Sequence, residues 1–263
     1  MILDRFRLDG KVAIVTAAGR GIGAGIAQAF AEVGADVAIG ARTQAQLEQV
    51  AEQVRRAGRR AVVVPGDLSQ REGMQALVDR AHAELGRIDV IVNNAGGSMP
   101  GPFLQTSERS FNEAFRWNVA TAFNLTQLAV PHLLKVGGGS VINIASAAGR
   151  FHERGFCAYG TAKAALVALT QNLAADLAPK VRVNAIAPGA IETSALGIVL
   201  TNPAIVRRMV ELTPMKRLGA VEDIAAAAVY LASAAASYVT GVVLDVGGGI
   251  RHSNFDMGIA DLE

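Results

Sequence analysis

Short runs of β-branched residues alternate along this chain with longer stretches in which apolar residues recur at helical spacing. The short runs predict strands at Val12–Thr16, Val37–Ile39, Ala61–Val64, Ile88–Val92, Ser140–Ile144, Val181–Ala185 and Val242–Val246. The longer stretches predict helices at Ile22–Val33, Gln44–Ala57, Gln70–Leu85, Glu108–Leu134, Ala162–Leu177 and Val221–Ala232. Because the strand runs are apolar throughout, helices are predicted on both faces of the sheet. The sequence therefore predicts a Rossmann-like α/β fold with a doubly wound parallel sheet of about seven strands.

This rhythm continues without a linker, a low-complexity tract or an internal repeat. At 263 residues the chain is predicted to be a single dinucleotide-binding catalytic domain, residues 1–263. Two segments lack periodicity: residues 190–215, which are long enough to form a substrate lid, and the irregular tail 250–263. We expect the apolar residues of the tail to pack on a neighbouring subunit; they are Phe255, Met257, Ile259 and Leu262.

Charge and composition exclude several classes of protein. The 25 basic and 23 acidic residues are interspersed, whereas a nucleic-acid-binding surface needs a basic stripe. The uncharged stretch Ile224–Leu244 is rich in Ala and Ser and holds Thr240-Gly241, so it predicts a helix, a loop and a strand rather than a membrane span. With Cys157 as the single cysteine and no apolar N-terminal stretch of signal-peptide length, we expect a soluble, cytoplasmic protein that binds neither nucleic acid nor membranes.

No metal site is predicted. The four histidines show no metal-ligand spacing; they are His82, His132, His152 and His252. Cys157 has no histidine placed to activate it and is predicted to be a small buried residue rather than a nucleophile.

A glycine-rich turn follows the first predicted strand. Thr16 leads into Ala17-Ala18-Gly19-Arg20-Gly21-Ile22-Gly23, and a predicted helix begins there. Glycines let a backbone approach a diphosphate, and the N-terminus of a helix offers free N–H groups and a positive dipole end. This turn therefore predicts a dinucleotide site.

The end of the second predicted strand indicates which dinucleotide binds. Folds of this kind usually place an acidic residue there to accept a hydrogen bond from the ribose 2′-OH. This chain has Gly40-Ala41-Arg42 instead. Arg42 and Arg20 suit a 2′-phosphate through charge-assisted hydrogen bonds, although both could equally be solvated surface residues. The loop favours NADP(H) over NAD(H).

Tyr159-Gly160-Thr161-Ala162-Lys163 places a phenol and an ammonium on one face of a helix. A tyrosine has a pKa of about 10, and lowering it by about three units requires roughly 4 kcal/mol. A cation about 4 Å away supplies about that much at an effective dielectric constant of about 20. The pair therefore predicts Tyr159 as an acid–base whose pKa is lowered by Lys163.

At these residues the chain resembles a short-chain dehydrogenase/reductase of the roughly 250-residue branch, and the resemblance runs from Leu8 to Gly249. The family motifs are matched in order by Thr16, Gly21 and Gly23 of the turn, Asn93-Asn94-Ala95-Gly96, Asn118, Ser146, Tyr159 with Lys163, and Pro188-Gly189. Ala17 departs from the family, which has glycine there. Because alanine can keep an ordinary φ, we expect a slightly displaced adenosine ribose rather than lost binding.

The resemblance implies a role for each matched residue. Tyr159 exchanges the proton with the reacting oxygen, Lys163 also holds the nicotinamide ribose, and Ser146 bonds the reacting oxygen. Asn118 holds a water in the proton path, although Asn118 or Ser146 taken alone could equally bond backbone. The implied cofactor contacts are Thr16, Gly19, Arg20, Gly21, Ile22, Gly23, Arg42, Asp67, Leu68, Asn94, Ala95, Gly96, Tyr159, Lys163, Pro188, Gly189, Ile191 and Thr193.

The resulting hypothesis is an NADP(H)-dependent oxidoreductase that acts on a small ketone or secondary alcohol and assembles as a homodimer or homotetramer. The segment from Pro188 to Gly219 is most similar to 7α-hydroxysteroid dehydrogenases and 3-oxoacyl-carrier-protein reductases, so the substrate stays open between a steroid, a 3-oxoacyl group and a similar ketone. The alternative is a nucleotide-sensing or structural protein of the same fold that lacks turnover.

Overall fold

The computed structural model describes residues 1–197, 201–255, 259 and 261. The strands form one parallel sheet of seven in the order β3-β2-β1-β4-β5-β6-β7. They are β1 (Val12–Thr16), β2 (Asp36–Ala41), β3 (Ala61–Pro65), β4 (Val90–Asn93), β5 (Gly139–Ile144), β6 (Val181–Pro188) and β7 (Val243–Val246). The predicted fold class is confirmed.

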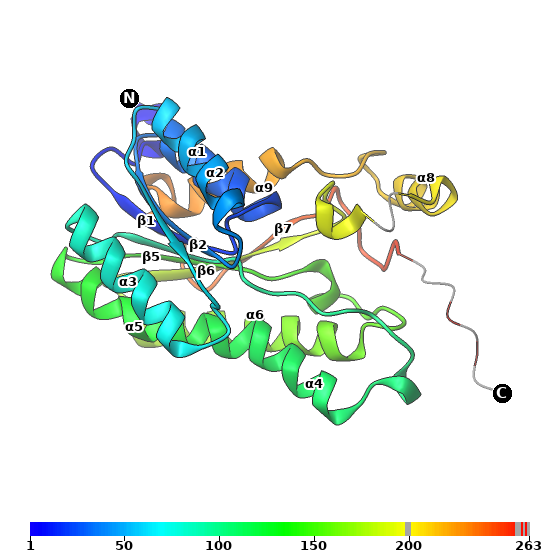
Figure 1. Cartoon of the computed structure of the whole chain (residues 1–263). Helices are drawn as coiled ribbons and strands as arrows, with labels where there is room; N and C mark the ends of the chain where they lie inside the picture. The colour runs from blue at the N-terminus through cyan, green and yellow to red at the C-terminus, as the bar shows by residue number, and fades with distance from the viewer. Residues whose placement is uncertain (198–200, 256–258, 260, 262–263) are drawn as a thin grey trace.

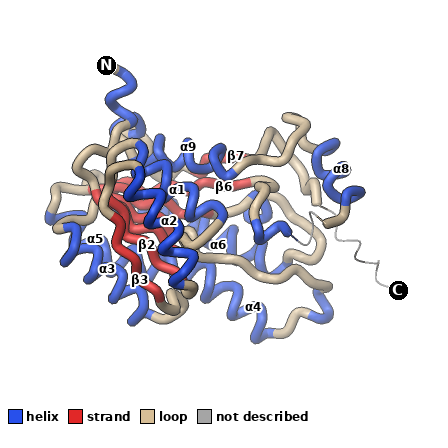
Figure 2. Tube along the Cα trace, turned by 45° about the horizontal axis from the view of Figure 1, so that its top comes forward, coloured by secondary structure: helices blue, strands red, loops and turns tan. Residues whose placement is uncertain are grey.

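Helices cover both faces of the sheet (Figures 1 and 2). The α-helices are α1 (Gly21–Glu32), α2 (Gln44–Arg56), α3 (Arg71–Leu85), α4 (Glu108–Phe115), α5 (Thr121–Lys135), α6 (Cys157–Leu177), α8 (Pro203–Leu212) and α9 (Val221–Ala232). Helices α1, α2 and α9 pack on one face, and α3, α5 and α6 on the other. The sequence therefore folds into three layers.

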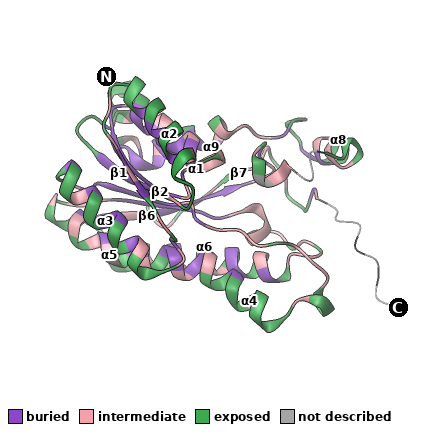
Figure 3. Cartoon of the chain, viewed as in Figure 1, coloured by how far each residue is buried: buried purple, intermediate pink, exposed green. Residues whose placement is uncertain are grey.

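Strand β1 shows why the strand sequences are continuously apolar. Ala13 and Val15 belong to the core cluster under α1 and α9, whereas Val12 and Ile14 belong to the cluster under α3 and α5. Successive side chains of a strand point to opposite faces, so a central strand needs apolar residues at every position. Figure 3 shows the buried strands between helices that expose their outer sides.

The strand order places a crevice beside β1. The chain moves outward from β1 to β2 and β3, then returns to β4 on the other side of β1. In open parallel sheets, ligands bind outside the carboxyl ends of the strands at such a switch point. The turns that follow β1 and β4 meet there.

The stretch predicted as one helix, Glu108–Leu134, is α4 and α5 joined by a π-helical turn at Arg116–Ala120. Asn118 lies in this turn, completely buried, and its Nδ2 donates to the carbonyl of Ala114 at 2.8 Å. Single π turns within α-helices often occur at functional sites. The prediction of an uninterrupted α-helix was wrong at this position.

Several other elements differ from the predictions. Helix α6 begins at Cys157 rather than Ala162, so Tyr159 and Lys163 share one helix as their spacing requires. Cys157 is exposed at the start of this helix, so the expectation of a buried cysteine was wrong. The segment 190–215, predicted to be irregular, contains α8. The side chain of Asn202 caps α8 by accepting from the N–H groups of Ala204 and Ile205, and Pro203 occupies its first turn. This cap-and-proline signal was present in the sequence.

The uncharged stretch Ile224–Leu244 forms most of α9, the 3₁₀ turn Ala234–Ala236 and the start of β7, as predicted. Within the residues that the structure describes, no helix combines the length and the apolar character that crossing a bilayer demands.

Candidate active site

The turns after β1 and β4 are joined through one hydroxyl group. Thr16 Oγ1 donates to the carbonyl of Val92 at 3.2 Å and accepts from the N–H groups of Asn94 and Ala95 at 2.9 and 3.0 Å. Asn94 Nδ2 returns a hydrogen bond to the carbonyl of Thr16 at 3.0 Å. These bonds fix the backbone of the motif from 93 to 96 against the turn from 16 to 23.

Two glycines of the turn are required, one for its backbone conformation and one for lack of space. Gly21 has φ +56°, and a Cβ on Gly23 would lie 2.5 Å from Asn94 Nδ2 and 2.7 Å from the carbonyl oxygen of Ala17. Helix α1 begins at Gly21, and no side chain caps its first N–H groups. The turn thus presents backbone donors and the positive end of a helix dipole to the crevice, which fits a dinucleotide diphosphate.

Ala17 adopts the conformation that a glycine would have at this position. Its φ is +49°, in the left-handed region, so the expectation that alanine would keep an ordinary φ was wrong. The reason is that Thr16, Asn94 and the start of α1 fix the backbone on both sides of it. A left-handed alanine costs roughly 1–2 kcal/mol, and this network outweighs that cost.

The arginines predicted for a 2′-phosphate are exposed. Arg42 follows β2 and acts electrostatically on Asp67, as does Arg116 from the π turn. Hydrogen bonds from the backbone and the hydroxyl of Ser69 are the larger cause that lowers the pKa of Asp67, and the two arginines add to it. Arg116 was not predicted from the sequence, because it lies in the π turn, two residues before Asn118, and comes near Asp67 only in the folded chain.

Gly96, Asn118 and Lys163 meet at one point. A Cβ on Gly96 would lie 2.6 Å from Asn118 Oδ1 and 2.9 Å from Lys163 Nζ. Lys163 is buried, and its Nζ donates to the carbonyl oxygen of Ile144 at 2.7 Å. Three motifs that are separate in the sequence therefore converge at the carboxyl edge of β4 and β5.

Both the oxygen and the nitrogen of the Asn118 side-chain amide form hydrogen bonds with backbone groups. Its Oδ1 accepts from the N–H of Gly97 at 2.9 Å, and its Nδ2 donates to the carbonyls of Gly97 and Ala114. Both amide protons are used by the protein itself. Asn118 thus ties the loop after β4 to the π turn.

Tyr159 lies beside Ser146. Burial raises the pKa of Tyr159, and a hydrogen bond with Ser146 opposes that rise. Ser146 Oγ also accepts from the N–H of Ala148 at 3.2 Å, at the start of the 3₁₀ turn Ala147–Gly149. The pair presents a phenol and a hydroxyl side by side, an arrangement that can bond one oxygen atom from two directions.

The pKa of Tyr159 is raised by burial rather than lowered by Lys163, contrary to the expectation from the sequence. The Nζ of Lys163 lies 5.7 Å from the centre of the Tyr159 ring, and burial lowers the pKa of Lys163 to about 7. Near neutral pH the ammonium is only partly populated, so its attraction for a phenolate is weak.

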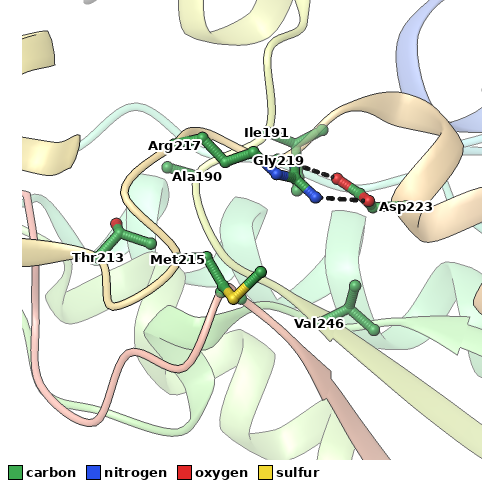
Figure 4. A pocket seen from close by; sticks show the side chains of 10 residues that line it. Ala190, Ile191, Thr213, Met215, Arg217, Gly219, Asp223 and Val246 are labelled. Atoms are coloured by element: carbon green, nitrogen blue, oxygen red, sulfur yellow. Dashed lines mark hydrogen bonds and ion pairs between the residues drawn. The ribbon is translucent and has the colours of Figure 1, made fainter.

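The segment after β6 reaches both the turn and a cavity. Thr193 Cγ2 lies 3.5 Å from the place that a Cβ of Gly21 would take, and Gly189 packs against Gly247 too closely for a side chain. Ile191 is buried and pairs with Gly219. A cavity of about 160 Å³ opens beside them (Figure 4); its lining includes Ile191, Thr213, Met215, Arg217 and Gly248.

Comparison with known proteins places the chain in a family. The sequence profile described as enoyl-(acyl carrier protein) reductase matches residues 16–251. An uncharacterized oxidoreductase of Mycobacterium tuberculosis is 55% identical over 263 residues, which is 100% of both chains. The chain belongs to the short-chain dehydrogenase/reductase family of oxidoreductases, which use a nicotinamide cofactor.

Two solved structures share the fold closely. One is described as a 7α-hydroxysteroid dehydrogenase complexed with NADH and 7-oxo glycochenodeoxycholic acid; it has a TM-score of 0.92 and 41% identity, covering 95% of this chain and 98% of that one. The other is a gluconate 5-dehydrogenase from Burkholderia cenocepacia in complex with NADP and tartrate, with a TM-score of 0.89 and 33% identity, covering 95% and 98%. Relatives of this fold thus bind either dinucleotide.

Proposed function

We propose that the chain transfers a hydride between NADP(H) and a ketone or secondary alcohol, with Asn118, Ser146, Tyr159 and Lys163 as the catalytic group. The observation that carries the proposal is the meeting of Gly96, Asn118 and Lys163 beside the Tyr159–Ser146 pair. This arrangement supports turnover over the alternative of a nucleotide-sensing or structural protein, because binding a dinucleotide requires neither a phenol beside a hydroxyl nor a buried lysine next to them.

The nicotinamide supplies or accepts the hydride when it is bound. Tyr159 keeps its proton near neutral pH because burial raises its pKa, so it can donate that proton to a carbonyl oxygen during reduction. Ser146 holds the same oxygen through its hydroxyl. In oxidation Tyr159 must first lose its proton, so that direction is favoured at higher pH.

The cofactor would lie along the carboxyl edge of the sheet. Its diphosphate would rest on the backbone of Gly19, Gly21, Ile22 and Gly23, and Lys163 would hold the nicotinamide ribose. Asp67, Leu68, Asn94 and Ala95 would line the adenosine side, and Pro188, Gly189, Ile191 and Thr193 the nicotinamide side. The arginines Arg20 and Arg42 would bind a 2′-phosphate, for which Gly40-Ala41-Arg42 offers no competing carboxylate.

The experiment is a ketone panel assayed through loss of NADPH absorbance. The panel contains a steroid ketone, a short 3-oxoacyl thioester and cyclohexanone, each tested with NADPH and with NADH. We expect NADPH-dependent reduction of at least one ketone, and none by Tyr159→Phe. Tight NADPH binding without turnover of any ketone would favour the nucleotide-sensing alternative.

We also propose that the chain forms a homodimer or homotetramer through α4, α5 and α6. Phe115 and Phe123 are 43% and 42% exposed on this helical layer, and large exposed aromatic residues are common at subunit interfaces. Light scattering at micromolar concentration tests this. We expect Phe123→Glu to shift the protein toward the monomer, and a monomeric wild type would contradict the assembly.

A further inference from the structure

The described part of the C-terminal tail contacts its own chain rather than standing free. Ser253 Oγ donates to Glu153 Oε1 at 2.5 Å, and Asn254 Nδ2 donates to Thr213 Oγ1 at 3.0 Å. Asn254 and Thr213 are both buried. Phe255 and Ile259 make contacts within the chain. The expected packing of the tail on a neighbouring subunit stays a prediction, and Met257 and Leu262 lie outside the described residues.

The two anchor points stand on different walls of the active-site cleft. Glu153 belongs to the loop between Ser146 and Tyr159, whereas Thr213 follows α8 and lines the cavity beside Ile191. The tail therefore spans from the α8 segment to the loop that precedes the catalytic helix. Figure 1 shows it leaving β7 on the same side of the molecule as α8.

Aromatic contacts continue from the tail to the catalytic tyrosine. The ring of Phe255 meets that of Phe156 edge-on, with centroids 5.8 Å apart, and the ring of Phe156 lies 6.0 Å from that of Tyr159. Phe255 and Phe156 are only partly buried. Each therefore has ring surface left for another apolar molecule.

Two exposed apolar residues, Met215 and Met99, belong to neighbouring segments. Met215 lines the cavity with 63% of its surface exposed, and Figure 4 shows its side chain there. The N–H of Gly101 donates to the carbonyl of Gly155, which brings the loop carrying Met99 to the same mouth. Met99 is 81% exposed. A ligand that covers exposed Met and Phe side chains binds more favourably only if the ligand surface that covers them is itself apolar.

The carboxyl group of Glu153 forms its hydrogen bond with the C-terminal tail, so it is not available to a ligand. The carboxyl accepts from Ser253 Oγ, which accepts in turn from the N–H of Phe255 at 3.3 Å. Burial raises the pKa of Glu153, and contacts with Ser253 and the backbone of Phe255 oppose the rise. Because both contacts go to the tail, Glu153 positions Phe255 over Phe156. The entrance to the proposed ketone site, between the tail and the loop from 150 to 156, thus presents aromatic surface instead of a free carboxylate.

We propose that Phe255 is a specificity-determining residue, which forms the outer wall of the ketone site and selects substrates with a bulky, apolar ring body. This inference rests on the proposed function. In this proposal the tail contacts the part of the substrate that lies farthest from the reacting carbonyl.

A ladder of ketones tests the assignment: cyclohexanone, 2-decalone and a steroid ketone, each with NADPH. For Phe255→Ala we expect KM to rise at least ten-fold for the two larger ketones, with kcat and the KM for cyclohexanone within about three-fold of wild type. Phe255→Tyr keeps the aromatic wall and should restore the larger ketones. The matched control is Asp261→Asn, which removes the exposed ion pair between Asp261 and Arg154 and should leave all three ketones unchanged.

An equal change for all three ketones, no change, or a selective gain for the steroid ketone would overturn the role of Phe255. Absence of turnover by the wild type would instead count against the proposed function. In that case the role of Phe255 as the outer wall of the site can still be tested by measuring amide hydrogen exchange of residues 150–156 and 253–255. We expect the steroid ketone to slow exchange there in the NADPH-loaded protein, and unchanged exchange would overturn the inference.

Discussion

The nucleotide end and the substrate end of the cleft are constructed by different means. At the nucleotide end, Thr16 and Asn94 bond mainly to backbone, and Gly23 lies against the carbonyl of Ala17 and the amide of Asn94. At the substrate end, the walls are held together by side chains: Asn254 on Thr213, Ser253 on Glu153 and Phe255 on Phe156.

This difference determines what each end tolerates. A single methyl group on Gly23 would collide with the carbonyl of Ala17, so changes at the nucleotide end disturb the backbone. Side-chain contacts between a tail and two loops can be exchanged while the sheet stays as it is. Cofactor binding and substrate choice are therefore separable properties of this fold, which is how one scaffold serves many ketones.

The largest effect is expected at Tyr159, where the two ends meet. Tyr159→Phe keeps the ring but removes the proton donor, and a general acid is typically worth 10²–10⁴ in rate. We expect kcat to fall by that factor while the Kd for NADPH stays within about three-fold. The control is Tyr238→Phe, since Tyr238 is fully exposed. Retention of most activity by Tyr159→Phe would rule out this mechanism.

The next effect tests the nucleotide end alone. A charge-assisted hydrogen bond contributes roughly 1.5–3 kcal/mol, so kcat/KM should favour NADPH over NADH by about ten- to a hundred-fold. Ala41→Asp combined with Arg42→Ile should reverse this preference, because the carboxylate repels a 2′-phosphate and accepts from a 2′-OH. The relative kcat/KM of the ketones in the ladder should not change. Equal use of both cofactors by the wild type would show that the arginines face solvent.

Burial of Lys163 predicts a pH dependence of stability. Its pKa falls from 10.5 to about 7 on folding, so between these values the unfolded chain binds more protons and stability rises with pH. At about 1.4 kcal/mol per pH unit, we expect a gain of about 1.5 kcal/mol from pH 7 to 8.5. Denaturant unfolding of wild type and Lys163→Met measures it. If the free energy of unfolding of Lys163→Met rose by the same amount over this pH range, groups other than Lys163 would be responsible for the pH dependence.

The smallest effect concerns Ala17. Ala17→Gly removes the cost of the left-handed alanine but adds the entropy of an unfolded glycine, so we expect a gain of at most about 1 kcal/mol. Ala18→Gly is the matched control, because Ala18 is buried and has no positive φ. It should lose about 1 kcal/mol. Thermal unfolding compares the two, and a loss of stability in both would mean that Ala17 carries no strain.

Local features of the site could be predicted because they depend on neighbours in the chain. The order of strands and helices follows from periodicity, the phosphate-facing turn from its glycines, and the pairing of Tyr159 with Lys163 from helical spacing. The cap of α8 at Asn202 was also a local signal, which the search for periodicity alone did not detect.

The environment of these residues could not be predicted in the same way. Spacing suggested that Lys163 would lower the pKa of Tyr159, but both groups are dominated by burial, which depends on how α6 packs on β5 and β6. The left-handed φ of Ala17 likewise comes from bonds between β1 and β4, which are about 76 residues apart.

The sequence by itself determined the layers, the doubly wound parallel sheet of about seven strands and the residue types available for chemistry, because these depend on local propensity and apolar pattern. Only the tertiary structure decided which of those residues meet. The contact of Gly96 with Asn118 and Lys163, the approach of Arg116 to Asp67, and the edge-on contact of Phe255 with Phe156 join segments with no shared periodicity. Their contacts follow from close packing of the whole chain, which no local pattern encodes.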